Sequence, residues 1–445
     1  MINYELKATF DNLKESLLED SVGRNESIAD LIKFLDETEG NIAIALNDSW
    51  GNGKTFFVKQ TQMVLQSYDS SDPELAKVKK CMEKYFKNHQ VKHYIPVYYD
   101  AWSNDNDDDP ILSIIFEMLQ DIEDLQQYEV TDKDWWNRIT FGIETISTSF
   151  GGPRVKKFLD AIKGEDPFKE IKKIKETDQI LNDIFDALLE KCPEDTRIIF
   201  FIDELDRCCP DFAVRLLERI KHHFLHEKVI FVITINSLEL QHTIKRHYGN
   251  DFNANQYLHR FFDFSIPLPS ADMKKYYSSI HFTNISRWRN DVANSVIQKY
   301  KFSLREITRY LQYLKAAVPE KYPSFQSKHP FYMEILIPFL IGLNIHNLKK
   351  YNEFINGENA EEFIKIMLDC SPDSYFEMLL VRGHETFEVN SKDNRKILSL
   401  ADKFQPIYEC LFGGDREREI SVYGDTICAS DRQMILNVIS RIRAS

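Results

Sequence analysis

The segment that most constrains this chain is D-S-W-G-N-G-K-T at Asp48–Thr55. It follows an apolar run, I-A-I-A-L, within Asn41–Asn47, and a helical pattern begins at about Lys54. Gly51 and Gly53 lack Cβ atoms, so the backbone can wrap closely around an anion. A glycine-containing turn between a buried strand and a helix directs several N–H groups to one place, which is the arrangement that binds phosphate. We therefore expect a chain built around a phosphate-binding loop.

The residues of this loop have separate predicted roles. Lys54 is expected to bridge the β- and γ-phosphates of a nucleotide, and the Thr55 hydroxyl is expected to bind Mg²⁺. Asp48 stands where the common pattern G-x-x-x-x-G-K-[ST] has glycine, and a carboxylate beside phosphates is unfavourable unless it points away. A chance match in a strand–helix turn is the competing interpretation. The other predicted nucleotide-contacting residues are Ser49, Trp50, Gly51, Asn52, Gly53 and Phe56.

An acidic pair ends another apolar run further along the chain. R-I-I-F-F-I-D at Arg197–Asp203 predicts a buried strand, and Glu204 follows it directly. Asp203, at the carboxyl end of a parallel strand, is expected to hold Mg²⁺ through water. Glu204 is expected to polarise the attacking water, provided that it lies across the γ-phosphate from Lys54. The alternative is an ordinary acidic turn at the end of a strand.

Three more apolar runs, at His93–Tyr99, Lys228–Ile235 and Asp263–Leu268, predict further strands. The runs lack alternation and helical patterns separate them, which is typical of an α/β fold with a parallel, doubly wound sheet. Along the chain, the run at His93–Tyr99 lies between the loop and the acidic pair. This order fits P-loop enzymes that have an additional central strand and a catalytic glutamate. Asn236, which follows a later run, is then expected to sense the γ-phosphate, with Thr234 in reserve and a plain strand-end cap as the alternative.

The domain boundary is expected near Pro267–Pro269, because two prolines bracket a leucine there and strand-like runs fade beyond it. We expect a P-loop domain at residues 1–269 and a mainly α-helical C-terminal domain at residues 270–445. A helical insert is expected at about residues 103–190 of the first domain.

Composition narrows the class of protein. A net charge of −14 with 43% hydrophobic residues excludes a disordered chain and argues against wide adhesion to DNA or anionic membranes. A basic cluster at Arg154–Lys175 still allows a local nucleic-acid groove, although a solvated helix face is the simpler interpretation. The seven cysteines lack metal-ligand spacing, which favours a reducing cytoplasm over a zinc site. The most apolar window, Phe331–Ile345, contains Glu334 and is too short to cross a bilayer, so no transmembrane helix is predicted.

Four stretches resemble the KAP family of P-loop NTPases. The loop D-S-W-G-N-G-K-T is similar to the family's G-x-W-G-x-G-K-[ST], and F-I-D-E-L-D-R-C at Phe201–Cys208 is similar to its F-I-D-D-L-D-R-C. Y-Y-D-A-W at Tyr98–Trp102 and Y-L-H-R-F-F-D-F-S-I-P-L-P at Tyr257–Pro269 are weaker matches. The likeness covers about residues 18–315 and implies a soluble, bacterial-type member that binds ATP and Mg²⁺.

The resemblance also implies an activity. It suggests ATP hydrolysis that drives a conformational or assembly switch, through self-association or a partner protein, and relatives suggest prokaryotic defence against phage or plasmids. Glu204 stands where the family more often has a second aspartate, which strengthens the case for hydrolysis. Many relatives insert transmembrane helices between the two motifs, but this span has no bilayer-length apolar segment, so no membrane attachment is expected. Two alternatives stay open: a nucleotide-binding scaffold with negligible hydrolysis, for which Asp48 is the best argument, and an ATP-driven motor acting on nucleic acid.

Related ATPases suggest roles for arginines outside the motifs. Gly23-Arg24 resembles the segment that borders the adenine, with a helix-breaking turn as the alternative. Arg260 precedes the last strand, where ring ATPases place an arginine finger that acts in trans, with a surface arginine as the alternative. Arg305 is a candidate lid arginine, although an ordinary surface position is the favoured interpretation, and Arg207 is expected to form an intramolecular ion pair. Packing or surface positions are expected for Trp102, His222, His223 and His226.

Overall fold

The computed structural model describes residues 7–107, 109–124, 141, 177–280, 287–318, 328–369, 400–414, 419–422 and 425–443. The chain divides into two compact units, one of residues 7–276 and one whose main part begins at Tyr277. Most of the predicted insert, with the basic cluster Arg154–Lys175, lies outside the described residues.

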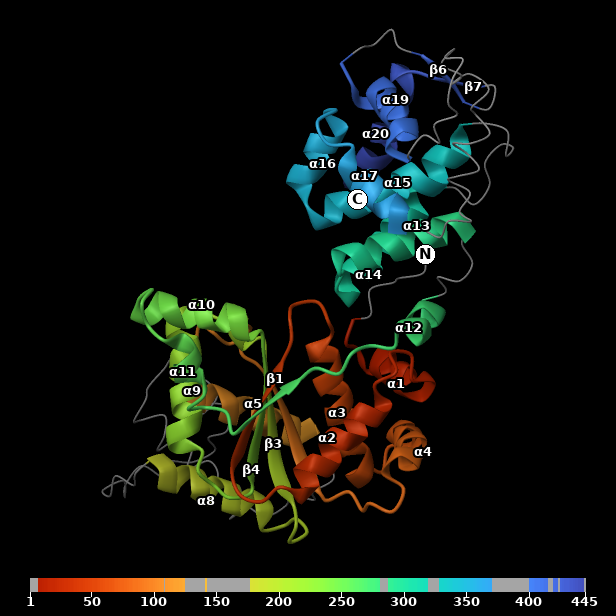
Figure 1. Ribbon diagram of the computed structural model, residues 1–445. Coiled ribbons are helices and arrows are strands. Elements are labelled where there is room, and N and C mark those ends of the chain that lie inside the picture. Colours follow the sequence, from red (N-terminus) through yellow and green to blue (C-terminus); the bar gives the residue numbers. More distant parts are fainter. Residues whose placement is uncertain are drawn as a thin grey trace. The chain divides into compact units, whose positions relative to one another are not determined.

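The first unit is built on a five-stranded parallel sheet (Figure 1). Its strands lie in the order β2-β3-β4-β1-β5, so that β4 separates the strand before the loop from the strand that ends in Asp203. All neighbouring strands are parallel, which confirms the predicted α/β fold. The strands are β1 (Ile42–Asn47), β2 (Tyr94–Asp100), β3 (Arg197–Asp203), β4 (Val229–Ile235) and β5 (Phe264–Pro267).

Helices cover both faces of the sheet, so the central strands are buried on both sides. Successive residues of β1 show this: Ile44 and Leu46 pack into one core cluster, and Ala43 and Ala45 pack into the other. This is why the strands show continuous apolar runs rather than alternation. The first cluster takes in α1 (Phe10–Glu19), α2 (Asn25–Glu37), α3 (Lys54–Asp69) and α4 (Pro73–Phe86); the second takes in α5 (Pro110–Asp124), α8 (Thr177–Leu189), α9 (Pro210–His223), α10 (Ser237–Tyr248) and α11 (Ala254–Leu258).

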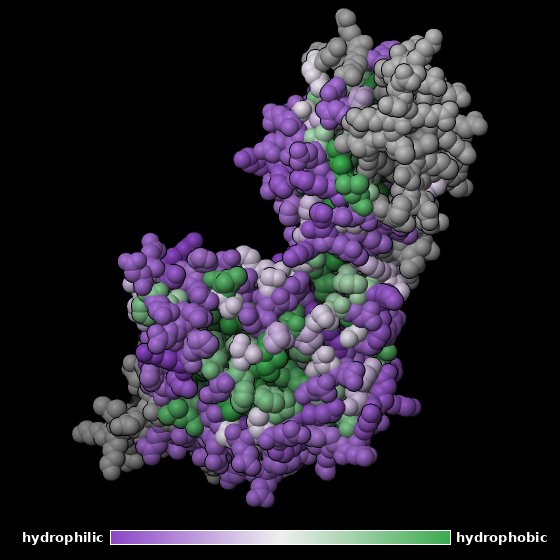
Figure 2. Space-filling model, viewed as in Figure 1, coloured by the Kyte–Doolittle hydropathy of each residue, from purple (hydrophilic) through white to green (hydrophobic). Residues whose placement is uncertain are grey.

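The two outermost strands differ from the central ones. β2 carries Pro96 in its middle, and a residue without an N–H is tolerated there because β2, among the described strands, has a neighbour on one side only. β5 is short, and Phe264 is 42% exposed, with its ring edge-on to that of Phe34 at 5.1 Å between centroids. Figure 2 shows a hydrophobic area around β5 on a face that is otherwise mainly hydrophilic.

The carboxyl ends of the parallel strands meet at one edge of the sheet. The register places Asp100 beside Asp203 and Asn47 beside Ile235. Asp48 continues directly from β1, and its N–H donates to the Ile235 carbonyl oxygen at 3.1 Å. The glycine-containing loop and the acidic pair therefore occupy the same edge.

The second unit, taken by itself, is mainly helical, as predicted. Glu334 is fully buried in it and forms an ion pair with Arg289 at 2.8 Å, so the charge in the apolar window is neutralised inside the core. The sequence pattern does not reveal its short antiparallel hairpin, β6 (Ile420–Val422) and β7 (Asp425–Ile427).

No helix in the described ranges has the length and apolar content needed to cross a membrane. The helices after β5 are α12 (Met273–Ser279), at the junction of the two units in sequence, then α13 (Arg287–Tyr300), α14 (Leu304–Ala317), a π-helical segment (Phe331–Leu336), α15 (Ile337–His346), α16 (Leu348–Ile355), α17 (Glu361–Asp369), α19 (Leu400–Phe412) and α20 (Ala429–Arg443).

Candidate functional site

The loop between β1 and α3 has the backbone that phosphate binding needs. Gly51 and Gly53 have φ values of 84° and 89°, in the left-handed region that residues with a Cβ rarely adopt. Gly53 immediately precedes α3, and no side chain caps this helix start, so its first N–H groups are available to an anion. Asn52 Nδ2 donates to Ser49 Oγ at 2.9 Å across the turn. The two glycines are therefore explained by the conformation of the loop.

Lys54 folds back over the loop that precedes it. Its Nζ donates to the carbonyl oxygens of Asp48 and Ser49, at 2.7 and 3.1 Å. Burial lowers the pKa of the Lys54 ammonium, and neighbouring carboxylates, led by Asp206, oppose this shift. The structure thus holds a buried cation at the glycine-containing turn.

The Asp48 side chain is hydrogen-bonded to the next residue of the loop. Its Oδ1 accepts from the Ser49 N–H at 2.7 Å, while the contact to Lys54 is made by the Asp48 carbonyl oxygen. Its φ is not in the left-handed region. The position therefore needs neither glycine's backbone freedom nor the absence of a side chain.

Arg24 contacts the loop from the start of α2. Its NH1 donates to the Asn52 carbonyl oxygen at 3.0 Å, and burial lowers the pKa of its guanidinium to about 10, with Asp48 opposing the shift. Gly23 has a φ of 71°, and a Cβ there would lie 2.5 Å from Asp272 Cβ. Arg24 therefore supports the loop backbone, and its role at the adenine stays a prediction.

Asp203 is buried at the end of β3 and accepts three hydrogen bonds. Its Oδ2 accepts from the Tyr98 hydroxyl at 2.9 Å, and its Oδ1 accepts from the Thr234 hydroxyl and from the Glu204 N–H at 3.0 Å. These donors come from β2, from β4 and from the following residue, so the carboxylate has a fixed orientation. Thr234, the reserve candidate, is thus the β4 residue that touches the acidic pair.

Glu204 begins the turn after β3 with a φ of 60°. Its carboxylate forms an ion pair with Arg207, three residues later in a short 3-10 helix, η1 (Leu205–Arg207). Burial, followed by the charge of Asp203, raises the pKa of Glu204 to about 7, although Arg207 acts in the opposite direction. A carboxyl group with a pKa near neutrality can act as a general base. The intramolecular ion pair expected of Arg207 is present.

Two tryptophans contact the same turn. The Trp50 indole N–H donates to Asp206 Oδ2, and the Arg207 guanidinium lies over the Trp102 ring, 5.5 Å from its centroid. Trp50 and Trp102 both lie in stretches that resemble the family, but the resemblance did not predict a hydrogen-bonding or charged partner for either of them. Sequence reasoning gave Tyr98 no role and named Asp206 only as the reserve carboxylate should Glu204 not be the base; the signal for both was their position in or beside the strand ends.

The remaining predicted site residues lie on α3, at the start of α10, on α14 or after α11. Asn236 caps α10, with its Oδ1 accepting from the Glu239 N–H at 3.5 Å, which is the alternative given for it above. Thr55 and Phe56 follow Lys54 in the first turn of α3 and are partly buried. Arg260 is exposed after α11, and Arg305 is exposed on α14 of the second unit.

A divalent cation fits the donors present. Asp203 offers a buried carboxylate and Thr55 a hydroxyl, and Mg²⁺ is commonly held by one or two such groups together with phosphate oxygens and water. In the part of the chain that the structure describes, no group of three His, Cys, Asp or Glu residues could hold a metal by itself. His222, His223 and His226 accordingly form no metal site.

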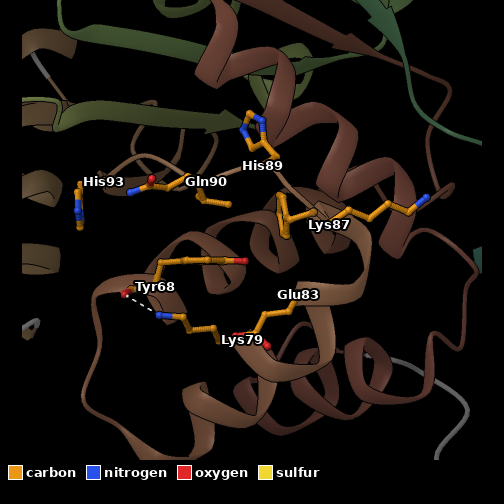
Figure 3. Close-up of a pocket in the computed structure, with 9 residues that line it drawn as sticks. Tyr68, Lys79, Glu83, Lys87, His89, Gln90 and His93 are labelled. Atoms are coloured by element: carbon orange, nitrogen blue, oxygen red, sulfur yellow. Dashed lines mark hydrogen bonds between the residues drawn. The ribbon is translucent and has the colours of Figure 1, made fainter.

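A cavity of about 490 Å³ lies elsewhere in this unit, near the amino end of β2 rather than at the carboxyl ends of the strands (Figure 3). His93, which lines it, immediately precedes the amino end of β2 and pairs with Asp69. His89 pairs with Asp36 at 2.6 Å, and Lys79 Nζ donates to the Tyr68 carbonyl oxygen at 3.5 Å. Both histidines and Lys79 thus have partners within the protein, and none of the predicted site residues lines the cavity.

We compared the chain with solved structures, with proteins of curated description and with models of protein families. The structure of PCH-2 from C. elegans matches at 13% identity over 81% of this chain and 68% of that chain, with a TM-score of 0.21, too low to support an argument. Among proteins with curated descriptions, none matches. The sequence model of the KAP family P-loop domain matches residues 24–320, which include the loop, both acidic residues and the whole parallel sheet. The chain therefore belongs to the KAP family of P-loop NTPases.

Proposed function

We propose that this protein hydrolyses ATP in a Mg²⁺-dependent reaction at the carboxyl edge of the sheet. The observation that carries the proposal is that the loop with Lys54 and the turn with Asp203 and Glu204 lie at one edge of the sheet, joined by the hydrogen bond from the Trp50 indole N–H to Asp206. A cation, a metal-ligand carboxylate and a base of raised pKa are the groups that phosphoryl transfer to water requires.

Each residue has a proposed task in this reaction. The loop N–H groups and Lys54 bind the β- and γ-phosphates, and Asp203 with Thr55 holds the Mg²⁺, which supplies charge neutralisation when bound. Glu204 accepts the proton of the attacking water, for which its ion pair with Arg207 has to open. The choice of adenine rests on the family resemblance.

We further propose, from the resemblance, that hydrolysis drives a conformational or assembly switch, with prokaryotic defence against phage or plasmids as its setting. The scaffold alternative stays open, with the charge of Asp48 beside Lys54 as its best argument. The basic cluster that left a nucleic-acid motor open lies outside the described residues.

Steady-state phosphate release tests the proposal. Glu204→Gln should keep a fluorescent ATP analogue bound but slow phosphate release by at least ~100-fold, the usual contribution of a positioned base. Glu227→Gln, an exposed glutamate of the same unit, is the matched control and should behave like the parent. Lys54→Ala should weaken binding of the analogue itself.

Equal rates in Glu204→Gln and the parent would contradict the assignment. Binding without release in the parent would favour the scaffold alternative, and release that rises strongly on adding nucleic acid would favour the motor.

A further inference from the structure

Trp50 belongs to the phosphate loop but is held by a different segment. Its ring is 44% exposed, yet its indole N–H donates to Asp206, which is only 6% exposed. A buried carboxylate needs hydrogen-bond donors, because burying an ionised group without them is costly. The loop supplies one such donor through Trp50.

The turn that contains Asp206 also carries the proposed base. Glu204 opens the turn with a positive φ, and Leu205 is fully buried in the core, so the turn is anchored on its inner side. On its outer side the Arg207 guanidinium pairs with Glu204 and covers the Trp102 ring. Asp206 is the residue of this turn that receives a hydrogen bond from the loop.

Lys54 donates its hydrogen bonds within the loop. Its Nζ contacts the carbonyl oxygens of Asp48 and Ser49, at 2.7 and 3.1 Å. Among the described residues, the side-chain hydrogen bond that joins the loop to this turn is therefore the one from the Trp50 indole N–H to Asp206.

We propose that the Trp50–Asp206 hydrogen bond is a positioning link through which the phosphate loop fixes the turn that carries Glu204. The inference rests on the proposed role of Glu204 as base. Trp50 and Asp206 are positioning residues here, acting through Glu204. A base displaced from its water slows the chemical step while the loop still binds phosphates, so loss of the link should lower kcat and leave nucleotide affinity unchanged.

Trp50→Phe tests the link, because it keeps an aromatic ring and removes the N–H donor. We expect kcat for phosphate release to fall about tenfold, the scale of one hydrogen bond to a charged group, with affinity for a fluorescent ATP analogue within twofold of the parent. Trp102→Phe is the matched control: the contact recorded for Trp102 is made by its ring face, so kcat should stay at the parental value. In a Glu204→Gln background, adding Trp50→Phe should cause no further loss, because the link acts through Glu204.

Amide hydrogen exchange tests the link without requiring hydrolysis. The Arg207 and Cys208 N–H groups donate within the turn, to the carbonyl oxygens of Glu204 and Leu205 at 3.1 and 3.3 Å. In nucleotide-free protein, Trp50→Phe should speed exchange of these two amides severalfold, and Trp102→Phe should not. If the parent releases no phosphate but Trp50→Phe still speeds exchange of these two amides, the link is supported and the proposed hydrolysis is contradicted. An active parent whose kcat and amide exchange are both unchanged by Trp50→Phe would overturn the link, as would a loss of affinity as large as the loss of kcat.

Discussion

Asp48 contributes to the loop mainly through its backbone. Its carbonyl oxygen accepts from Lys54 and its N–H donates to Ile235, and every residue except proline provides both groups. The side chain adds a hydrogen bond to the next residue, Ser49. Its remaining effect on a bound nucleotide is electrostatic, a negative charge close to phosphates.

Asp48→Gly should therefore preserve the fold and bind nucleotide at least as tightly as the parent, because it removes the charge and keeps the carbonyl oxygen that accepts from Lys54. Titration with a fluorescent ATP analogue measures the effect. Asp48→Asn separates charge from side chain, since it keeps an acceptor for the Ser49 N–H and removes the charge. Weaker binding by both variants would mean that the carboxylate itself contacts the ligand.

At the scale of elements, α3 depends on the residue before its first turn. Gly53 holds a φ of 89° and a ψ of 33°, so the chain leaves the loop in a left-handed conformation and enters the helix one residue later. An alanine in that conformation costs roughly 1–2 kcal/mol. Relief of that strain would turn the first N–H groups of α3 away from the loop.

Gly53→Ala should thus lower the free energy of unfolding by about 1–2 kcal/mol and also weaken nucleotide binding at least tenfold. Gly249→Ala is the control for strain alone, because Gly249 ends α10 with a φ of 108° and open space around it. It should lose stability with unchanged nucleotide affinity. Denaturant unfolding and analogue titration of the two variants make the comparison, and equal affinities would contradict the proposed function of the helix start.

The sequence predicted the strands that are buried on both faces. It did not predict the short hairpin or the contacts that depend on how strands and turns lie beside one another. β1, β3 and β4 stand out as apolar runs, and the loop and acidic pair follow from the ends of those runs. The hairpin of β6 and β7 has three residues per strand, too few for a period to show.

The neighbours of the acidic pair required the three-dimensional structure. Tyr98 and Thr234 reach Asp203 because β2 and β4 flank β3, and that order cannot be derived from runs of apolar residues. Asp206 accepts a hydrogen bond from Trp50 because a 3-10 turn follows β3. A turn of three residues leaves no periodic pattern in the sequence. Asn236 lies at the end of β4 and caps α10, and its role as a sensor of the γ-phosphate stays a prediction.

At the scale of the whole molecule, the open question is whether one chain completes its own site. Arg260 lies at the end of α11, four residues before β5, and is exposed. Within the described residues its recorded hydrogen bond is a backbone one, from its N–H to the Tyr257 carbonyl oxygen at 3.1 Å. Related ring-forming ATPases have an arginine at this point that acts on a neighbouring subunit's γ-phosphate, and the same role is a prediction for Arg260.

An arginine that acts in trans makes hydrolysis depend on protein concentration, because the site is complete only when two chains meet. Arginine fingers contribute roughly 10³–10⁵ in rate, whereas an exposed arginine without a partner contributes nothing measurable, so the two cases differ widely. We expect specific activity to rise with concentration, and Arg260→Ala to abolish the rise while affinity for a fluorescent ATP analogue stays near the parental value. Arg246→Ala, at an exposed position of α10, is the control and should leave the rise intact. Flat specific activity, together with a monomeric mass in the presence of a non-hydrolysable analogue, would exclude the trans role. The catalytic cation would then have to come from the same chain, with Arg207, already paired with Glu204, or Arg305 as the candidates.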